Sequence, residues 1–301
     1  MLYPMLFTPI YQNYLWGGRR ILSHFGREGP SGKVAESWEL SALPEGMSLV
    51  ENGPLRGLSL ATLFEKEKKA LLGKDPHAEQ FPLLIKLIDA LENLSIQVHP
   101  REGKDEKNEA WLILDAAKDA KLYLGMKESY STHEIFERLG SKELVSMMQE
   151  VPALPGEIIY VPSGRLHAIG AGVLLLEVQQ SSNVTYRVYD WERKRPLHLK
   201  EAKEAMDCHD LYQPPSSPKL LSRSKVHTQF ELLRTPFFVI EKWHLFSNIT
   251  YSTRPDQCEI LFCTKGKNSL VPRGRTLLIP ACCSSLEIKS EGSELIRIYP
   301  P

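Results

Sequence analysis

Residues 155–172 read PGEIIYVPSGRLHAIGAG, and they carry the most specific structural pattern in the chain. Its fixed points follow the pattern Gly156-x5-Pro162-x-Gly164-x2-His167. The two glycines allow tight turns, and the proline makes the corner between them rigid. The run EIIYV between the turns is typical of a short buried strand. The stretch therefore predicts a strand between two turns, with His167 placed just after the second turn.

A second stretch, LSIQVH at residues 94–99, alternates strictly between apolar and polar side chains. This period of two is typical of a half-buried strand. Gln97 and His99 then share the polar face, two residues apart, and both could reach one metal ion. Glu109 follows a polar turn and could supply an oxygen ligand. An edge strand with Gln97 and His99 in solvent is the alternative, and the local pattern leaves both interpretations open.

Composition excludes several classes of protein. The 301 residues contain 37 Lys and Arg and 37 Asp and Glu, so no basic surplus points to nucleic acid or an anionic membrane. No apolar run is long enough to cross a bilayer. Pro4 and Pro9 interrupt the N-terminal apolar segment, which does not resemble a signal peptide. The five cysteines form no disulfide framework, and we expect a reduced, cytoplasmic protein.

Strand-like segments dominate the chain, with three helical insertions. Helices are expected at about 57–74, at 131–149 and at 198–207, and Gly140 should break the second into two pieces. The Pro- and Ser-rich segment 213–219 resembles a linker. The pattern therefore predicts a mainly β protein of the sandwich or jelly-roll class.

Two groups of charged residues lie within apolar runs. Lys86 interrupts the run FPLLIKLIDA, and a buried ammonium costs several kcal/mol unless it is paired. A Lys that extends out of the core to solvent is the alternative. Glu36 and Glu39 share one short predicted strand, and for these two acids a solvated face is the prediction.

The stretch from Gly156 to His167 resembles the second conserved motif of the cupin superfamily, in which the His is a metal ligand. Gln97 and His99 then stand in place of the paired His ligands of the first motif, although Gln replaces one His. The resemblance implies a cupin fold with a catalytic domain at residues 1–212. A similar Gly-x5-Pro step without a His, at residues 274–280, predicts a second, metal-free cupin-like barrel at residues 220–301.

Most of the first 200 residues resemble type I mannose-6-phosphate isomerases in their short bacterial form. The matching stretches are WGG (16–18), AESWE (35–39), LIK (84–86), LSIQVHP (94–100), KNEAW (107–111), PSGRLHAIGAG (162–172), QQSSN (179–183) and TYRVYDW (185–191). The resemblance implies one zinc ion bound by Gln97, His99, Glu109 and His167. It also implies that Arg187 is a catalytic residue. The likeness is weak beyond about residue 210.

The family interconverts mannose 6-phosphate and fructose 6-phosphate, so a proton must move from C2 to C1 through an enediol. A site of two neutral His, one Gln and one Glu leaves zinc electrophilic. Lys86 and Lys107 are candidates for phosphate binding or for the base, and Glu177 is a rival base. Arginine is a poor base because its pKa is very high, so Arg187 suits electrostatic stabilisation, proton positioning and substrate binding, and Lys86 is also a substrate-binding candidate. The base stays open among Lys107, Glu177 and Arg187.

Two other functions compete with the isomerase. One is another metal-dependent cupin, either a dioxygenase or a different sugar-phosphate isomerase, and the other is a non-catalytic sugar-binding cupin. Lys and Arg beside a Gln-containing site favour a small sugar phosphate as the partner. Neither a monomer nor a homodimer is favoured by the sequence.

Overall fold

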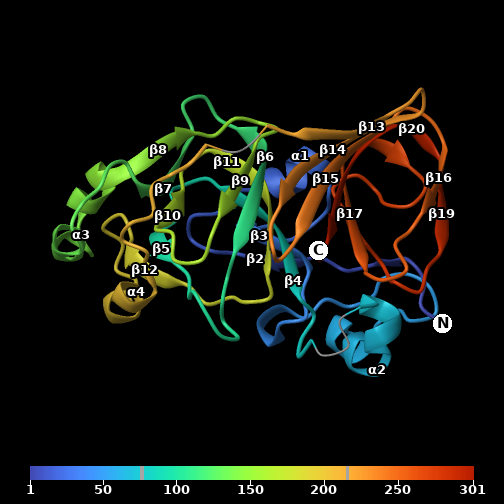
Figure 1. Ribbon diagram of the computed structural model, residues 1–301, viewed down its shortest axis with the longest axis horizontal. Coiled ribbons are helices and arrows are strands. Elements are labelled where there is room, and N and C mark those ends of the chain that lie inside the picture. The colour runs from blue at the N-terminus through green and yellow to red at the C-terminus, as the bar shows by residue number, and fades with distance from the viewer. Residues whose placement is uncertain (75–77, 215–216) are drawn as a thin grey trace. The chain divides into compact units, whose positions relative to one another are not determined.

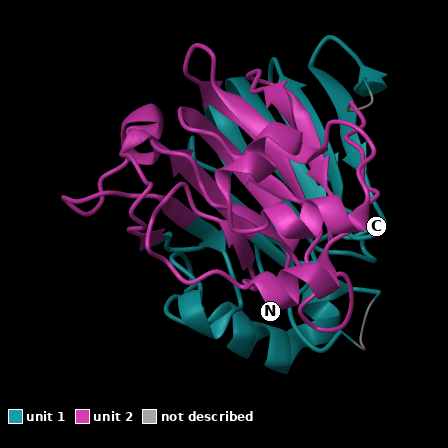
Figure 2. Ribbon diagram, turned by 90° about the vertical axis from the view of Figure 1, so that its left-hand side faces the viewer, with its two compact units in different colours: residues 1–10, 38–84, 216–301 teal, residues 11–37, 85–215 magenta. Residues whose placement is uncertain are grey.

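The computed structural model describes residues 1–74, 78–214 and 217–301. Contacts within the chain divide it into two compact units, drawn in different colours in Figure 2. Unit 1 consists of Met1–Ile10, Trp38–Leu84 and Ser216–Pro301, and unit 2 consists of Tyr11–Ser37 and Ile85–Pro215. Residues 38–84, which the sequence assigned to the catalytic domain, therefore belong by their contacts to unit 1. Part of the expected linker 213–219 lies outside the described residues.

Two antiparallel sheets carry the strands around the candidate site. The five-stranded sheet has the order β12 (Tyr186–Tyr189), β5 (Ile96–Val98), β10 (His167–Ile169), β7 (Lys121–Met126) and β8 (Met148–Pro152). The six-stranded sheet has the order β2 (Ile10–Gln12), β3 (Glu36–Leu40), β4 (Leu83–Ala90), β11 (Val173–Gln180), β6 (Glu109–Ala116) and β9 (Ile158–Val161). Strands β2, β3 and β4 each have residues in both units.

The core of unit 2 lies between these two sheets. Ile88, Trp111 and Leu175 of the six-stranded sheet pack in one buried cluster with Leu124 and Ile169 of the five-stranded sheet. Side chains alternate across a strand, so each sheet turns one face to this shared interior. The arrangement is the mainly β, jelly-roll type of fold that the sequence predicted.

Helices lie within each of the three predicted insertions. The helical segments are α1 (Arg20–Phe25), η1 (Pro44–Gly46), α2 (Leu60–Leu72), α3 (Thr132–Arg138), η2 (Lys142–Met147) and α4 (Leu199–Ala205). Ser131 and Glu134 form the expected capping box of α3. Gly140, with a φ of 82°, separates α3 from η2, as predicted. Helix α1 was not predicted.

The helices α3 and α4 cover the outer face of the five-stranded sheet (Figure 1). Ile135 of α3 and Ala202 of α4 share a buried cluster with Ile96, Val98 and Val188. Because side chains alternate along β5, this packing turns Gln97 toward the other face of the sheet, inside unit 2.

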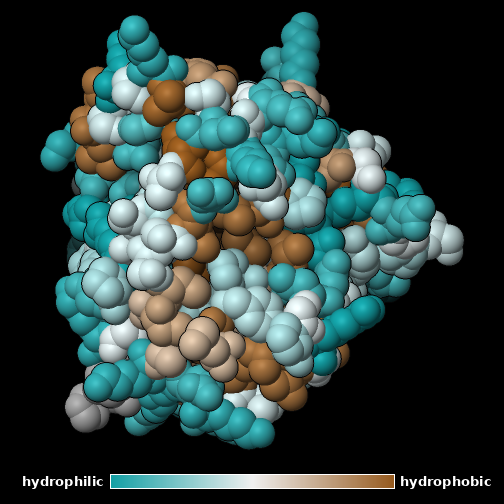
Figure 3. All heavy atoms as spheres, turned by 90° about the vertical axis from the view of Figure 1, so that its right-hand side faces the viewer, coloured by the Kyte–Doolittle hydropathy of each residue, from teal (hydrophilic) through white to brown (hydrophobic). Residues whose placement is uncertain are grey.

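Unit 1 contains most of the C-terminal strands. Its seven-stranded sheet has the order β1 (Met5–Leu6), β18 (Thr276–Ile279), β17 (Glu259–Asn268), β20 (Ser290–Tyr299), β15 (Val239–Leu245), β14 (His227–Arg234) and β13 (Lys219–Arg223). Strands β16 (Ile249–Ser252) and β19 (Ser285–Ile288) form a separate pair. Viewed from the end where β16 and β19 lie, apolar side chains gather near the middle of the visible surface (Figure 3).

Within unit 1, Arg297 is buried between Glu241 and Glu259, with nitrogen–oxygen distances of 2.9 and 2.7 Å. Among the described residues, no helix has the length and apolar character needed to span a membrane.

Candidate metal centre and active site

Strand β5 lies inside its sheet and is not an edge strand. It pairs with β10 on one side, where Gln97 lies opposite His167, and with β12 on the other, where Gln97 lies opposite Arg187. Three site residues therefore lie abreast on neighbouring strands. The solvent-exposed alternative for Gln97 and His99 is wrong, since His99 is 1% exposed and Gln97 is half-buried. Leu94 precedes the strand and packs in the core between the two sheets.

The turns predicted from the glycines are present. Gly156 has a φ of 94° and Gly164 a φ of 84°, and residues other than glycine rarely adopt such positive φ angles. A Cβ at Gly164 would lie 2.7 Å from the Arg101 side chain and 3.1 Å from the Ala205 carbonyl oxygen. These turns bring the chain back into the sheet at His167, which is fully buried.

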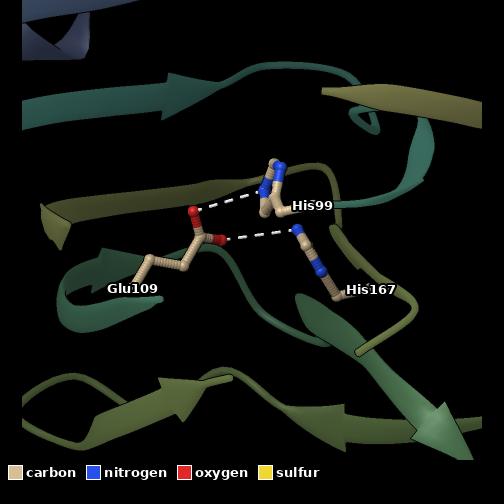
Figure 4. A group of neighbouring side chains, drawn as sticks. All are labelled: His99, Glu109 and His167. Atoms are coloured by element: carbon tan, nitrogen blue, oxygen red, sulfur yellow. Dashed lines mark ion pairs between the residues drawn. The ribbon is translucent and has the colours of Figure 1, made fainter. Parts of the chain in front are cut away.

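His99, Glu109 and His167 converge inside unit 2, and their candidate ligand atoms all lie within 4.8 Å of one another. Figure 4 shows Glu109 directed between the two rings. Its Oε2 lies 3.4 Å from Nε2 of His99, and its Oε1 lies 3.3 Å from Nε2 of His167. The side-chain nitrogen of Gln97 lies 3.3 Å from the same His167 atom.

Hydrogen bonds to the backbone orient both imidazole rings. Nδ1 of His99 lies 2.9 Å from the Val184 carbonyl oxygen, and Nδ1 of His167 lies 2.8 Å from that of Arg165. A carbonyl oxygen only accepts, so each Nδ1 carries the proton and each Nε2 keeps its lone pair. Burial lowers the pKa of His99 and lowers that of His167 to about 3. Both rings are thus neutral and able to ligate a metal.

Glu109 completes a donor set that fits a divalent cation. Burial alone would raise its pKa, but Lys107 and His99 outweigh that effect and hold the pKa well below its usual range. Its Oε2 forms an ion pair with Lys107 at 2.7 Å, but among the described residues neither carboxylate oxygen accepts a hydrogen bond of good geometry. Buried carboxylate oxygens of this kind are ordinarily bonded or bound to metal. Two imidazoles, a carboxylate and the Gln97 amide suit zinc and similar ions.

A second polar group occupies neighbouring strands of the six-stranded sheet. Lys86 of β4 is 3% exposed, and its Nζ lies 3.5 Å from Glu177 of β11 and 3.7 Å from Glu36 of β3. Burial alone would lower the pKa of Lys86, but the two carboxylates reverse the effect and raise it. Lys86 is therefore a buried, paired residue. The prediction of a solvated face for Glu36 and Glu39 is wrong, because both are buried.

Glu177 and Lys107 connect this group to the candidate metal ligands. Burial, together with Glu109, raises the pKa of Glu177, and Nε1 of Trp111 donates a hydrogen bond of 2.9 Å to its Oε2. Lys107 is buried, with its Nζ 2.7 Å from Glu109 and 3.1 Å from Nε2 of His99. Of the base candidates other than Arg187, Lys107 lies among the candidate ligands and Glu177 lies beside Lys86.

A cavity of about 260 Å³ opens onto these groups. Five residues chosen from the sequence line it: Lys86, Gln97, Lys107, Glu177 and Arg187. Residues that sequence reasoning missed also line it, among them Tyr14, Glu36, Ser95, Thr185 and Arg195. Arg195 lies in the charged run ERKR, which ordinarily indicates a solvated loop, and the sequence holds no signal that would have selected it. A larger groove of about 560 Å³, lined by residues 116–121 and 150–155, holds none of the candidate residues.

Arg187 occupies the rim of the five-stranded sheet beside the cavity. Its NH1 donates a hydrogen bond of 2.7 Å to the Pro196 carbonyl oxygen. Burial and the nearby Arg195 lower its pKa. Among the described residues its buried Nε has no hydrogen-bond partner. The Arg187 side chain therefore keeps hydrogen-bonding capacity for a ligand.

Comparisons with known proteins agree with this geometry. A family model described as the catalytic domain of type I phosphomannose isomerase matches residues 5–128. The mannose-6-phosphate isomerase of Streptococcus mutans is 35% identical over 260 residues, covering 82% of this chain and 80% of that protein. Mannose-6-phosphate isomerase ManA of Bacillus subtilis is 36% identical over 262 residues, covering 80% of this chain and 79% of its own.

A solved structure extends the similarity to nearly the whole chain. The crystal structure of the mannose 6-phosphate isomerase from Bacillus subtilis has a TM-score of 0.90 and 30% identity, and the match covers 99% of both chains. Two curated relatives above 30% identity, matched over about four fifths of their length, are sufficient to assign the family. The chain belongs to the type I phosphomannose isomerases.

Proposed function

We propose that this protein is a zinc-dependent isomerase that interconverts mannose 6-phosphate and fructose 6-phosphate through an enediol. The observation that carries the proposal is the convergence of His99, Glu109 and His167 on one point beside a cavity lined by Lys, Glu and Arg. The names of the relatives supply the substrate. Gln97, His99, Glu109 and His167 would hold the ion, and when bound it would polarise the substrate's carbonyl oxygen.

Glu177 is the residue we assign to proton transfer. The reaction takes the proton from C2 and returns it to C1, while a hydroxyl proton passes between the two oxygens. Burial raises the pKa of Glu177 while Lys86, 3.5 Å away, favours its ionised form, so the carboxylate is a stronger base than an exposed one. Trp111 donates to Oε2 and Lys86 lies 3.5 Å from Oε1, so the carboxylate is held in one orientation beside the cavity.

Lys107 and Arg187 then act through their charge. Negative charge develops on the substrate oxygens in the enediolate, and fixed cations in a water-poor cavity stabilise it. Lys107, buried against Glu109, is the cation beside those oxygens, whereas Arg187, on the strand next to Gln97, binds the far end of the substrate. Arginine keeps its proton at neutral pH, which suits it to this role and not to that of a base.

Two alternatives differ from this proposal in what the pocket must do. A dioxygenase cupin would use the metal but would have no need of the buried Lys86–Glu177 pair. A sugar-binding cupin would need neither a basic carboxylate nor a metal. The Lys86, Glu36 and Glu177 group, placed beside the ligands, favours proton transfer over both.

The first experiment is to measure metal content and turnover of mannose 6-phosphate on the purified protein. We expect about one zinc per chain, loss of turnover on chelation and recovery when zinc is returned. His99→Ala should abolish turnover and metal binding. The exposed His133, which lies on helix α3 away from the site, provides the control variant His133→Ala, which should retain both.

Three results would contradict parts of the proposal. Full turnover without metal would remove the metal from the reaction. Bound metal with no turnover would assign the site to another substrate. For the base, Glu177→Gln should lower kcat by about a thousandfold with a small change in KM and should stop exchange of the C2 proton with solvent. Retained exchange in that variant would transfer the role to Lys107.

A further inference from the structure

Arg195 lines the cavity beside Arg187, at a position that neither the metal nor proton transfer requires. We propose that Arg195, oriented by the buried Asp190, forms with Arg187 the seat for the phosphate group of the substrate. This inference rests on the proposed function, which supplies a phosphorylated sugar. Asp190 is a positioning residue, because it holds Arg195 and does not line the cavity.

The pair of Asp190 and Arg195 has the geometry of a fixed clamp. Nε and NH2 of Arg195 donate hydrogen bonds of 2.7 and 2.6 Å to the two oxygens of Asp190. Asp190 is 2% exposed, whereas a quarter of the Arg195 side chain remains accessible. A buried carboxylate that accepts two hydrogen bonds from a guanidinium fixes the plane of that guanidinium. Arg195 is thus held in place while its remaining N–H groups stay available.

The loop that carries this clamp is itself locked in an unusual conformation. Trp191 and Glu192 both have positive φ, at 53° and 60°, although neither is glycine. Such strain persists only where other contacts determine the backbone, and it gathers at functional sites. Nε1 of Trp191 donates a hydrogen bond of 2.6 Å to the Leu94 carbonyl oxygen, and Arg193 bonds the carbonyl oxygen of Asn93. These two hydrogen bonds hold loop residues 191–193 against residues 93 and 94, which precede β5.

Charge in the cavity favours an anion at this end. Lys86 and Lys107 already face buried carboxylates, Glu36 and Glu177 for the first and Glu109 for the second. Arg187 forms no ion pair among the described residues, and its buried Nε has no hydrogen-bond partner. Burial lowers the pKa of Arg187, and repulsion by the nearby Arg195 lowers it further, although Asp190 partly offsets that repulsion. A phosphate dianion between them would relieve that repulsion and accept bidentate bonds.

The position also matches the length of the substrate. Gln97 lies opposite Arg187 on one side and opposite His167 on the other. Neighbouring strands are about 4.8 Å apart, so Arg187 starts one strand beyond the ligand Gln97 and about 10 Å from the strand of His167. C1 and C2 lie at the opposite end of the substrate from the phosphate on C6. A sugar with its reacting carbons at the ligand cluster would extend its phosphate toward Arg187 and Arg195.

The test compares Arg195→Gln and Arg195→Lys with Lys194→Gln in the metal-loaded enzyme. Lys194 is exposed on the same loop, so its variant loses the same charge without altering the cavity. Arg195→Gln should raise the KM for mannose 6-phosphate roughly 10- to 100-fold with a much smaller change in kcat. Inorganic phosphate should also inhibit this variant less, by a similar factor. Arg195→Lys should fall between it and the wild type, and Lys194→Gln should match the wild type.

Asp190→Asn tests the positioning residue. It should raise KM in the same way as Arg195→Gln, and the double variant should be no worse than Arg195→Gln alone. Unchanged KM and unchanged phosphate inhibition in folded Arg195→Gln would overturn the assignment, as would an equal effect of Lys194→Gln. If Arg195→Gln does not fold, Arg195→Lys decides by the same two measurements.

Failure of the proposed function gives a different result from failure of this inference. A wild type that does not turn over mannose 6-phosphate contradicts the function. Calorimetric binding of inorganic phosphate to the wild type and to Arg195→Lys then still tests the anion seat. Equal binding to both would overturn it, and weaker binding to the variant would support it.

Discussion

Replacing Lys86 with methionine tests how far the buried charges of unit 2 depend on one another. Methionine keeps the length and flexibility of the side chain but removes its charge. Glu177 and Glu36, at 3.5 and 3.7 Å from Nζ, both lose that charge. Removing one partner of a buried ion pair costs about 3–5 kcal/mol, because the remaining charge stays out of water. We expect Lys86→Met to lower the free energy of unfolding by that amount at pH 7.

Protonation of a buried carboxylate limits the loss of unfolding free energy and makes that loss depend on pH. Protonating a Glu with an ordinary pKa of about 4.3 costs about 3.7 kcal/mol at pH 7, and this cost falls by about 1.4 kcal/mol per pH unit. The pKa of Glu177 is already raised by burial, and without Lys86 it rises further above its unfolded value, so a lower pH favours the folded variant. The difference from the wild type should shrink by up to about 1.4 kcal/mol when the pH falls by one unit, as Glu177 takes up its proton in the folded variant.

Urea unfolding, followed by tryptophan fluorescence at pH 7 and at pH 6, measures both effects. The matched control is Lys121→Met, since Lys121 pairs with Glu150 at 2.7 Å while both side chains are about half exposed. A surface pair of this kind contributes less than about 1 kcal/mol. The reasoning fails if Lys86→Met is no less stable than Lys121→Met at pH 7. It also fails if the loss does not diminish at pH 6.

Three further substitutions have defined outcomes. Trp111→Phe removes the N–H that bonds Glu177; a hydrogen bond to a charged group contributes about 1.5–3 kcal/mol, so kcat should fall roughly tenfold or more while metal content is unchanged. Arg297→Met leaves two buried carboxylates without their cation, and urea unfolding should show a loss of about 3–5 kcal/mol. Gly164→Ala forces a side chain into the left-handed region, and calorimetry should show a loss of about 1–3 kcal/mol.

Local patterns predicted the parts of the site that a short segment determines by itself. Alternation along β5 was sufficient to place Gln97 on the face opposite Ile96, because the period of a strand is fixed. The glycines of the second motif predicted turns that the positive φ angles of Gly156 and Gly164 confirm. Each of these predictions depends on fewer than a dozen consecutive residues.

Such local patterns could not predict which residues on distant strands lie side by side. Glu36 appeared to be on a solvated face because an acid on a short strand usually is, and only its position beside Lys86 on the next strand makes its burial tolerable. Arg195 looked like one member of a charged run, and its orientation depends on Asp190, whose own burial follows from tertiary packing. Likewise, residues 38–84 join unit 1 through contacts that no segment of the sequence encodes locally.

The buried charges around the candidate ligands would make substrate binding depend on a bound metal ion. Three carboxylates, Glu36, Glu109 and Glu177, accompany two ammonium groups, Lys86 and Lys107, while both His rings are neutral. Three negative and two positive charges leave this group at −1, and a divalent cation changes it to +1. A negative charge at the ligands repels the enediolate that forms beside them, whereas a positive charge attracts it and adds to the positive end of the cavity at Arg187 and Arg195. Metal content should therefore control the affinity for anionic ligands as well as turnover.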